Sequence, residues 1–297
     1  MIGKNKAHLA SFTANLIYGA NFSIAKLVMP GMIKPNGFIL LRVVFATLLF
    51  SLMRFLYSKG QKVERKDLFR FFLLGLFGVA INQLLFFQGL SRTSNINAAL
   101  IMTSNPVMVL LFAGLIIGER ITILRILGIL CGIIGAGSLI FMSKAHGIGS
   151  FSGDLMIFIN AASYAVFMVM VKPMMQKYGT WLVLSWTFFF GTILVIPFGF
   201  ADTMAIDWST FETIHWSALI FVIFFTTFLA YLLNTFSLKE LSPSVVSYYI
   251  YIQPIFATLI SMLLFNESLK WIQIVSCLLI FSGVWLVTRP TLVKLKS

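Results

Sequence analysis

Long runs of apolar residues, separated by short polar breaks, extend along almost the whole chain. Each run is about 20 residues long, the length that an α-helix needs to cross the hydrocarbon core of a bilayer. The pattern therefore predicts an all-α integral membrane protein with ten transmembrane helices. The predicted spans are residues 9–29, 37–57, 68–90, 96–117, 123–142, 153–173, 181–200, 214–236, 244–265 and 270–288.

The composition excludes an ordinary soluble protein. Of the 297 residues, 59% are hydrophobic and 10% are charged, whereas soluble domains carry about 25% charged residues. The loops left between ten spans are too short for a soluble catalytic domain, so any function must be built inside the membrane. Cys131 and Cys277 lie within apolar runs and have no metal-ligand spacing, and we expect neither a metal nor another cofactor.

The net charge of +13 is distributed unevenly between alternate loops. Most of the 22 lysine and arginine residues lie on the side that carries both termini, whereas the loop after the seventh span contains Asp202, Asp207 and Glu212 and no base. The positive-inside rule therefore predicts a multi-pass protein of the cell inner membrane with both termini in the cytoplasm. It also explains the basic excess without a nucleic-acid partner, and leaves the lipid bilayer as the expected surrounding.

The chain repeats itself at half its length. A shift of 148 residues places Pro106 on Pro254 and Gly135 on Gly283, and it places the segment LIIGERIT on LLFNESLK. Each half, residues 1–146 and 147–297, then holds five spans. Because five is odd, the second half enters the membrane from the opposite side, and the halves are predicted to be inverted repeats.

Inverted repeats favour a transporter that works by alternating access. The two faces of such a protein are built from the same parts, so its inward-open and outward-open states can have similar energies. An intramembrane enzyme is the competing class. The sequence contains no HExxH motif, no Gly-x-Ser-x-Gly elbow and no pair of carboxylates in the middle of a span, so we expect no catalysis.

Several segments resemble one transporter family. They are YGANFSIAK in the first span, FILLRVVFATLLF in the second, and a proline-containing span ending in Gly-Glu-Arg in the first half and Asn-Glu-Ser in the second. These segments are similar to the EamA-type branch of the drug/metabolite transporter superfamily. The resemblance covers the whole chain and implies ten helices, cytoplasmic termini and the export of amino acids and related small metabolites.

Two prolines fall near the middle of the predicted spans. Pro106 and Pro254 lack an N–H and disrupt the preceding helical turn, so each predicts a kink that is tolerated only against protein or a wet cavity. An amide precedes each proline, Asn105 and Gln253. One interpretation is a kink for packing, with the amides bonded to neighbouring helices. The other is a substrate site at the midplane, to which the nearby Tyr248 and Tyr249 would contribute.

Other spans carry polar residues that are costly in hydrocarbon and should point inward. Together they predict a lumen of amides, phenols and aromatic rings, which suits a neutral or zwitterionic small molecule better than a polyanion. Import, or transport of a nucleobase, a sugar or a drug, remains an alternative. The predicted substrate-binding residues on these spans are Asn15, Tyr18, Asn82, Gln83, Tyr164, Tyr231 and Asn234.

Charged residues near the span ends are candidates for gating. The repeat relates Lys26 to Lys172 and Glu267 to Glu119. One hypothesis is therefore two symmetric ion pairs, Lys26 with Glu267 at one entrance and Lys172 with Glu119 at the other. In the alternative, the lysines extend to lipid headgroups and the glutamates cap helices. Arg42, the deepest base, either orders helix ends or meets a substrate carboxylate near the outer mouth.

The remaining sequence features concern coupling and assembly. No Asp, Glu or His lies near the middle of any predicted span, which favours facilitated export or exchange over a dedicated proton relay. Gly128, Gly132 and Ala136 recur every four residues and predict close helix packing within the chain. We therefore expect a monomer or a weak homodimer.

Overall fold

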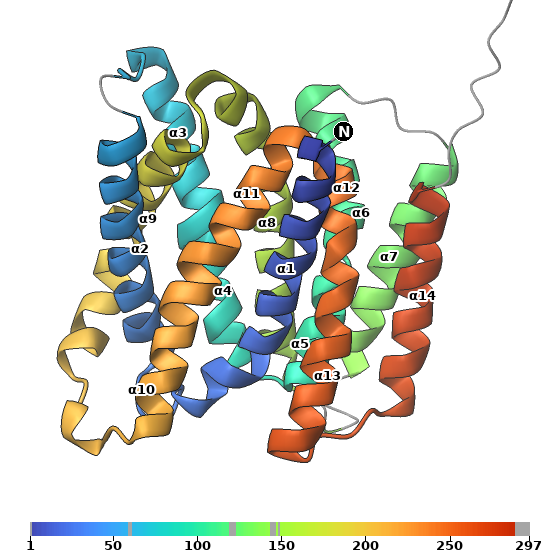
Figure 1. Ribbon diagram of the computed structural model, residues 1–297. Helices are drawn as coiled ribbons and strands as arrows, with labels where there is room; N and C mark the ends of the chain where they lie inside the picture. Colours follow the sequence, from blue (N-terminus) through green and yellow to red (C-terminus); the bar gives the residue numbers. More distant parts are fainter. Residues whose placement is uncertain (1, 59–60, 119–122, 143–146, 148, 289–297) are drawn as a thin grey trace, which may run out of the picture.

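The computed structural model describes residues 2–58, 61–118, 123–142, 147 and 149–288. Its helices form one bundle in which successive spans run in opposite directions (Figure 1). Six of the predicted spans are continuous α-helices, although several extend beyond the predicted ends. They are α1 (Ile2–Ile24), α2 (Pro35–Tyr57), α7 (Ile123–Met142), α8 (Phe151–Tyr178), α9 (Thr180–Met204) and α14 (Trp271–Thr288).

The other four spans are helices with a break or a wide turn inside them. The third and eighth spans contain π-helical segments, and the fourth and ninth are broken before their prolines. Their parts are α3 (Leu68–Gly75), Leu76–Ala80 and α4 (Ile81–Leu90); α5 (Asn95–Met102) and α6 (Asn105–Ile117); α10 (Thr213–Ile220), Phe221–Leu229 and α11 (Ala230–Glu240); and α12 (Pro243–Tyr248), Tyr249–Tyr251 and α13 (Ile252–Phe265).

The lengths and surfaces of the helices fit a bilayer. Seven helical segments among the described residues are long and apolar enough to cross a membrane, and α7 and α14 each contain a shorter apolar stretch. Large apolar side chains cover the outside of the bundle; Phe141, Leu263 and Trp271 are each more than three-quarters exposed. Such a surface is stable in lipid and not in water. The prediction of a ten-helix, all-α membrane protein is confirmed.

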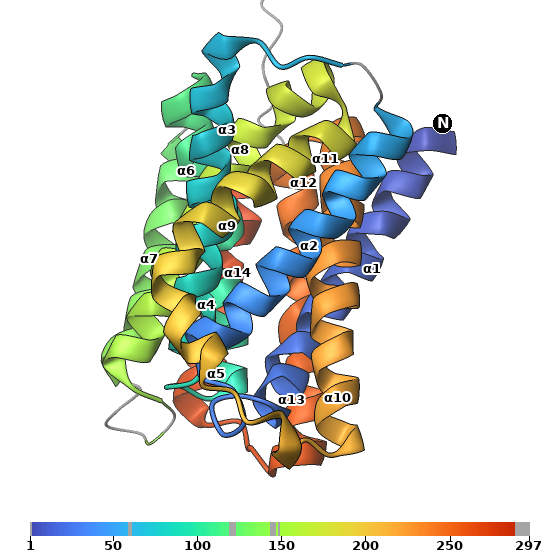
Figure 2. The ribbon, with the colours of Figure 1, turned by 90° about the vertical axis from the view of Figure 1, so that its left-hand side faces the viewer.

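The helix contacts show the inverted repeat directly. Helix α2 packs along α9, and α7 packs along α14 (Figures 1 and 2). Helix α1 contacts α11 and α13, and its counterpart α8 contacts α4 and α6. Exchanging the two halves of the chain leaves the α2–α9 and α7–α14 contacts unchanged and converts the two α1 contacts into the two α8 contacts. Two five-helix units therefore surround a shared centre.

Small residues bring α7 and α14 together; their spacing predicts close helix packing within the chain, and the structure identifies the partner helix. A side chain at Gly283 would meet the backbone of Gly128 and Gly132, and one at Gly135 would meet the backbone of Ser276. Ser276 also shares a hydrogen bond of 2.6 Å with Ser138. The close approach increases the number of van der Waals contacts, which hold helices together where lipid supplies no hydrophobic force.

Hydroxyl side chains satisfy the backbone at the break before Pro106. Thr103 Oγ1 donates to the Leu100 carbonyl at 2.5 Å, and Ser104 Oγ donates to the Ile101 carbonyl at 2.7 Å. The carbonyls of Leu100 and Ile101 also accept the backbone N–H groups of Thr103 and Ser104, at 3.1 and 3.0 Å. The break is therefore stable while buried in protein.

An ionic cluster joins the start of α3 to the end of α8. Lys177 Nζ lies 2.6 Å from the buried carboxylate of Asp67 and 2.5 Å from Glu64, and Tyr178 donates to Asp67 at 2.7 Å. Glu64 also forms an ion pair with Lys66, in which 2.7 Å separate Lys66 Nζ from Glu64 Oε2. Hydrogen bonds from Lys177 and then Lys66 lower the pKa of the Glu64 carboxyl from its ordinary value of 4.5.

This cluster predicts a loss of stability in acid. Because the pKa of Glu64 is lower in the folded chain, its carboxylate stabilises the fold above pH 4.5, and that contribution disappears as the pH falls through the lowered pKa. Thermal unfolding of the purified protein between pH 3 and 7 measures it. A Glu64→Gln variant should have a flatter profile below pH 4.5; an identical profile would show that Glu64 contributes nothing.

Candidate functional site

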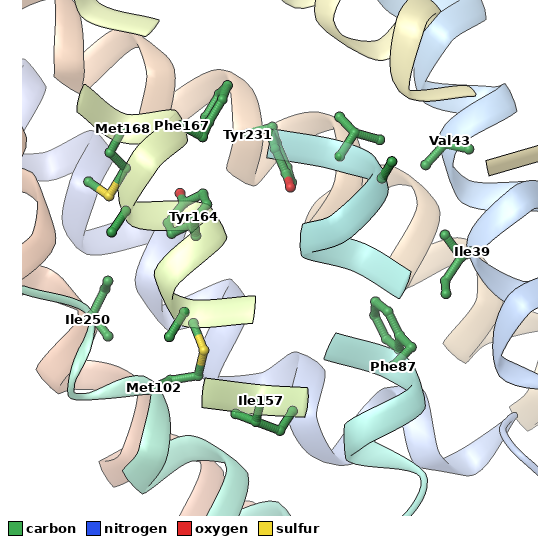
Figure 3. Close-up of a cluster of buried hydrophobic side chains, with 14 of the residues drawn as sticks. Ile39, Val43, Phe87, Met102, Ile157, Tyr164, Phe167, Met168, Tyr231 and Ile250 are labelled. Carbon is green, nitrogen blue, oxygen red and sulfur yellow. The ribbon is translucent and has the colours of Figure 1, made fainter. Parts of the chain in front are cut away.

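A cavity of about 60 Å³ lies between the two repeats. Helices α1, α2, α4 and α5 of the first half contribute to its wall, together with α8, α11, α13 and the segment Phe221–Leu229 of the second half. Six of the predicted substrate-binding residues line the cavity: Tyr18, Asn82, Gln83, Tyr164, Tyr231 and Gln253. Figure 3 shows two of them, Tyr164 and Tyr231, in a cluster of buried side chains that also contains Phe87 and Met102.

The repeat symmetry continues into the wall of the cavity. Tyr18 on α1 and Tyr164 on α8 are equivalent positions of the two halves, and both line it. Gln83 and Tyr231 are likewise equivalent, and the Gln83 amide donates to the Tyr231 hydroxyl at 3.2 Å. Tyr231 also contacts the Asn82 side chain at 3.1 Å. Four of the six residues thus form two symmetric pairs.

A chain of amides holds Gln253 in place. Its Nε2 donates to Asn15 Oδ1 at 2.7 Å, and Asn15 Nδ2 donates in turn to the Ser11 carbonyl at 2.8 Å. Because the last acceptor is a backbone oxygen, the orientation of each amide is fixed. Asn15 therefore supports a cavity residue from within α1, instead of lining the cavity as predicted.

Asn105 is turned away from the cavity, unlike its counterpart Gln253. Its Nδ2 donates to the Ala161 carbonyl on α8 at 2.7 Å, and the side chain is fully buried. For Asn105 the structure therefore agrees with helix-to-helix bonding at a packed kink. The two amides before the prolines have different surroundings, so they do not form the symmetric pair that the sequence suggests.

Other predicted residues lie near the cavity without lining it, because a helix can present only one face to it. The Asn234 amide does not line the cavity but donates to the hydroxyl of Tyr164, which does. Tyr249 contacts His8 Nδ1 at 2.7 Å. Successive tyrosines point in different directions around the 3₁₀ turn, which has three residues per turn. The predicted site residues outside the lining are Asn15, Asn105, Pro106, Asn234, Tyr248, Tyr249 and Pro254.

The two π-helical segments escaped the sequence analysis. Leu76–Ala80 lies within the third span and Phe221–Leu229 within the eighth, at positions that the repeat makes equivalent. A π-helical turn inserts a residue into the α-helical register and often occurs at functional sites. Here the first segment leads directly into Asn82 and Gln83, and the second carries Thr226 into the cavity wall. Nothing in the hydrophobic pattern marks such an insertion.

Arg42 lies in the wall of the cavity, deeper than a residue at the mouth. Its side chain is 2% exposed. Nε donates to the Thr227 hydroxyl at 2.7 Å, and the guanidinium carbon lies 4.2 Å from the centre of the Phe87 ring and 5.7 Å from that of Phe38. The sequence placed Arg42 with the gating residues, and it was not predicted to line the cavity.

The predicted gating residues Lys26 and Glu267 both contact the turn at residues 93–96, at the end of the bundle opposite the start of α1. Lys26 Nζ donates to the Thr93 carbonyl at 2.6 Å. The Glu267 carboxylate accepts the backbone N–H groups of Asn95 and Ile96, both at 3.2 Å. Among the described residues they form no direct ion pair. Glu267 caps a helix as the alternative supposed, although that helix is α5 of the other repeat.

The opposite end of the bundle shows the symmetric lysine contact. Lys172 Nζ donates to the Leu241 carbonyl at 2.7 Å, just as Lys26 does to Thr93. Each acceptor directly precedes a serine that caps the following helix, Ser94 or Ser242. Glu119, the predicted partner of Lys172, lies outside the described residues.

Asp154 at the start of α8 was not identified from the sequence. It is fully buried, and its Oδ1 accepts from Thr93 Oγ1 and from Asn97 Nδ2, both at 2.6 Å. It therefore fixes the same turn that Lys26 contacts. An acid close to the start of an apolar run was the available signal.

The fold and the cavity together define a class of protein. Two inverted five-helix repeats around a central cavity lined by amides and aromatic rings are the architecture of a secondary transporter. No group of three or more His, Cys, Asp or Glu side chains that could hold a metal occurs within the described part of the chain. The model of the EamA-like transporter family matches residues 5–141 and again residues 151–289. The chain belongs to this family of membrane transporters.

Individual relatives agree with the family. An uncharacterized transporter of Bacillus subtilis, YyaM, is 27% identical over 91% of this chain and 89% of its own length. An uncharacterized transporter of Archaeoglobus fulgidus is 24% identical over 96% of this chain and 98% of its own. A solved crystal structure with 18% identity covers 95% of both chains with a TM-score of 0.67, which shows the common fold.

Proposed function

We propose that this protein exports small neutral or zwitterionic metabolites, amino acids or related compounds, across the cell inner membrane by alternating access. Both termini face the cytoplasm, and the protein works as a monomer or weak homodimer, without cofactor and without catalysis. The observation that carries the proposal is the cavity, whose wall of amides, phenols and aromatic rings is contributed by both repeats. Such groups can hold a small solute by hydrogen bonds and ring contacts without demanding a high charge.

Thermal unfolding with candidate solutes tests the substrate class. A ligand that binds only the folded protein raises the unfolding temperature by mass action. Purified protein is heated with each of the twenty L-amino acids, and with nucleobases and hexoses as competing classes. We expect stabilisation by a subset of the amino acids. Stabilisation by nucleobases or hexoses alone would redirect the proposal to another solute, and no stabilisation by any of them would contradict it.

Transport in proteoliposomes tests the mechanism. A stabilising amino acid, labelled and placed outside vesicles that contain an excess of the unlabelled form, should accumulate by counterflow. Because no Asp, Glu or His lies near the middle of any predicted span, an imposed pH gradient should not increase the accumulation of the labelled solute. Accumulation driven by the gradient would establish proton coupling instead.

A matched pair of variants separates binding from packing. Gln253→Leu removes an amide from the cavity wall, so we expect it to weaken solute affinity about tenfold, as for one lost hydrogen bond of about 1.4 kcal/mol. Asn105→Leu removes the equivalent amide outside the cavity. It should lower the unfolding free energy by about 1 kcal/mol and leave the affinity of the folded protein unchanged.

Binding is measured by titration on the purified variants, and stability by thermal unfolding without solute. Equal effects of the two variants on affinity would mean that the cavity described here is not the binding site.

A further inference from the structure

A buried cation without a counter-charge lies in the wall of the cavity. The Arg42 guanidinium is almost completely excluded from solvent. Among the described residues no carboxylate lies within ion-pair distance of it, and Nη1 has no hydrogen-bond partner there. Burying an ionised group that is neither paired nor fully hydrogen-bonded is costly, and arginine does not lose its proton to escape that cost.

The neighbouring residues compensate this charge only in part. Thr227 accepts from Nε, and the ring of Phe87 faces the guanidinium at 4.2 Å. A cation–π contact replaces a fraction of the lost hydration, and it also holds the planar group in one orientation. Nη1 of the guanidinium is therefore held in position and left without a partner among the described residues. A group arranged in this way is complete only when an anion meets it.

Neutral acceptors stand elsewhere in the same wall. The side-chain oxygens of Asn21, Gln83 and Asn160 are buried and have no hydrogen-bond partner in the described structure. The orientation of Asn160 is fixed because its Nδ2 donates to the Asn82 carbonyl at 2.5 Å. These oxygens can accept from N–H or O–H groups of a solute. Because amide oxygens only accept hydrogen bonds, they bind the N–H and O–H groups of the solute and do not pair with a carboxylate of the solute.

We propose that Arg42 binds the carboxylate of the transported solute, and that a free carboxylate is a requirement for transport. This inference rests on the proposed function and specifies its substrate class. The planar guanidinium matches a carboxylate with two parallel hydrogen bonds. One arginine balances a single negative charge, so the solute carries one carboxylate. Its donor groups, an ammonium in the case of an amino acid, face the amide oxygens of Asn21, Gln83 and Asn160.

The first experiment uses the unaltered protein, so it does not depend on the folding of a variant. Each stabilising amino acid is compared with its amide and with the amine that lacks the carboxyl group, by thermal unfolding and by competition in counterflow. We expect both analogues to bind about 10- to 100-fold more weakly, the effect of losing a hydrogen-bonded charged partner. Short monocarboxylates without an ammonium should still compete.

Variants then assign the requirement to Arg42. Arg42→Lys keeps the charge without the planar fork, and Arg42→Gln removes the charge. Both variants should strongly lower the affinity for the amino acid and hardly change the affinity for its amide. Arg42→Gln should therefore no longer distinguish the two solutes. Thr227→Val is the matched control: it removes the partner of Nε and should retain the preference for the acid. A merely structural Arg42 would lower the affinity for acid and amide alike.

The outcomes separate this inference from the proposed function. If acid and amide bind the unaltered protein equally, the protein still transports the solute and the role of Arg42 is wrong. The same follows if Arg42→Gln keeps the preference for the acid. If no amino acid, monocarboxylate or neutral solute binds or is carried, the proposed function itself fails, and the role of Arg42 fails with it.

Discussion

Gly135→Leu is expected to lower the free energy of unfolding by about 1–3 kcal/mol or more, the cost of overpacking a close contact. A side chain at this position would meet the Ser276 carbonyl and the backbone nitrogen of Ile280 on α14. Backbone atoms of a helix cannot move aside as a flexible side chain can. The two helices must therefore separate, and the hydrogen bond of 2.6 Å between Ser138 and Ser276 is lost with them.

Gly137 provides the control on the same helix. No atom lies within 4 Å of a side chain added there, among the described residues. Gly137→Leu keeps the composition of the first variant and should be neutral or slightly stabilising, because leucine favours a helix over glycine. Thermal unfolding of both variants in the same detergent gives the difference. Equal destabilisation would mean that α7 and α14 are not held together through this face.

Much of the fold could be predicted because it is encoded in local patterns. The apolar runs gave ten helices, since a bilayer imposes one length on every span. Several matches at a shift of 148 residues, among them Gly135 with Gly283, predicted the inverted repeat. Small residues four apart predicted a close helix contact, and the structure identifies α14 as the partner of α7. The helix ends were less predictable: α1 begins at Ile2, because a helix continues beyond the bilayer as long as its backbone bonds are satisfied.

The site was predictable in residue type and less so in position. Polar residues inside spans had to face inward, and Tyr18, Tyr164 and Gln253 do line the cavity. Asn105 does not, because the direction of a side chain after a helix break depends on the turn that forms there. Arg42 could be placed near an entrance by its depth along α2, but its contact with Phe87 depends on how α2 and α4 pack. Such tertiary contacts have no signature in one sequence.

Reversing the charges of Lys26 and Glu267 together is not expected to restore the stability that is lost when either charge is reversed alone. A pure ion pair would tolerate the exchange, because only the attraction between the two side chains would count. In the structure each charge faces backbone groups of fixed polarity: Lys26 faces the Thr93 carbonyl, and Glu267 faces two N–H groups at the start of α5. A carboxylate at position 26 and an ammonium at position 267 would both be repelled.

Each single reversal, Lys26→Glu or Glu267→Lys, should lower the unfolding free energy by about 0.5–2 kcal/mol, the usual worth of a helix cap. The double variant should lose about the sum of the two values. Thermal unfolding of the four proteins gives the coupling between the sites, and Glu267→Gln, which keeps one acceptor for an N–H group, should lose less than Glu267→Lys. Recovery in the double variant would establish the ion pair instead. If the losses add, the backbone contacts are what hold this entrance. Lys172 makes the same contact with Leu241 at the other end, so alternating access requires the two contacts to open in turn, one at each entrance.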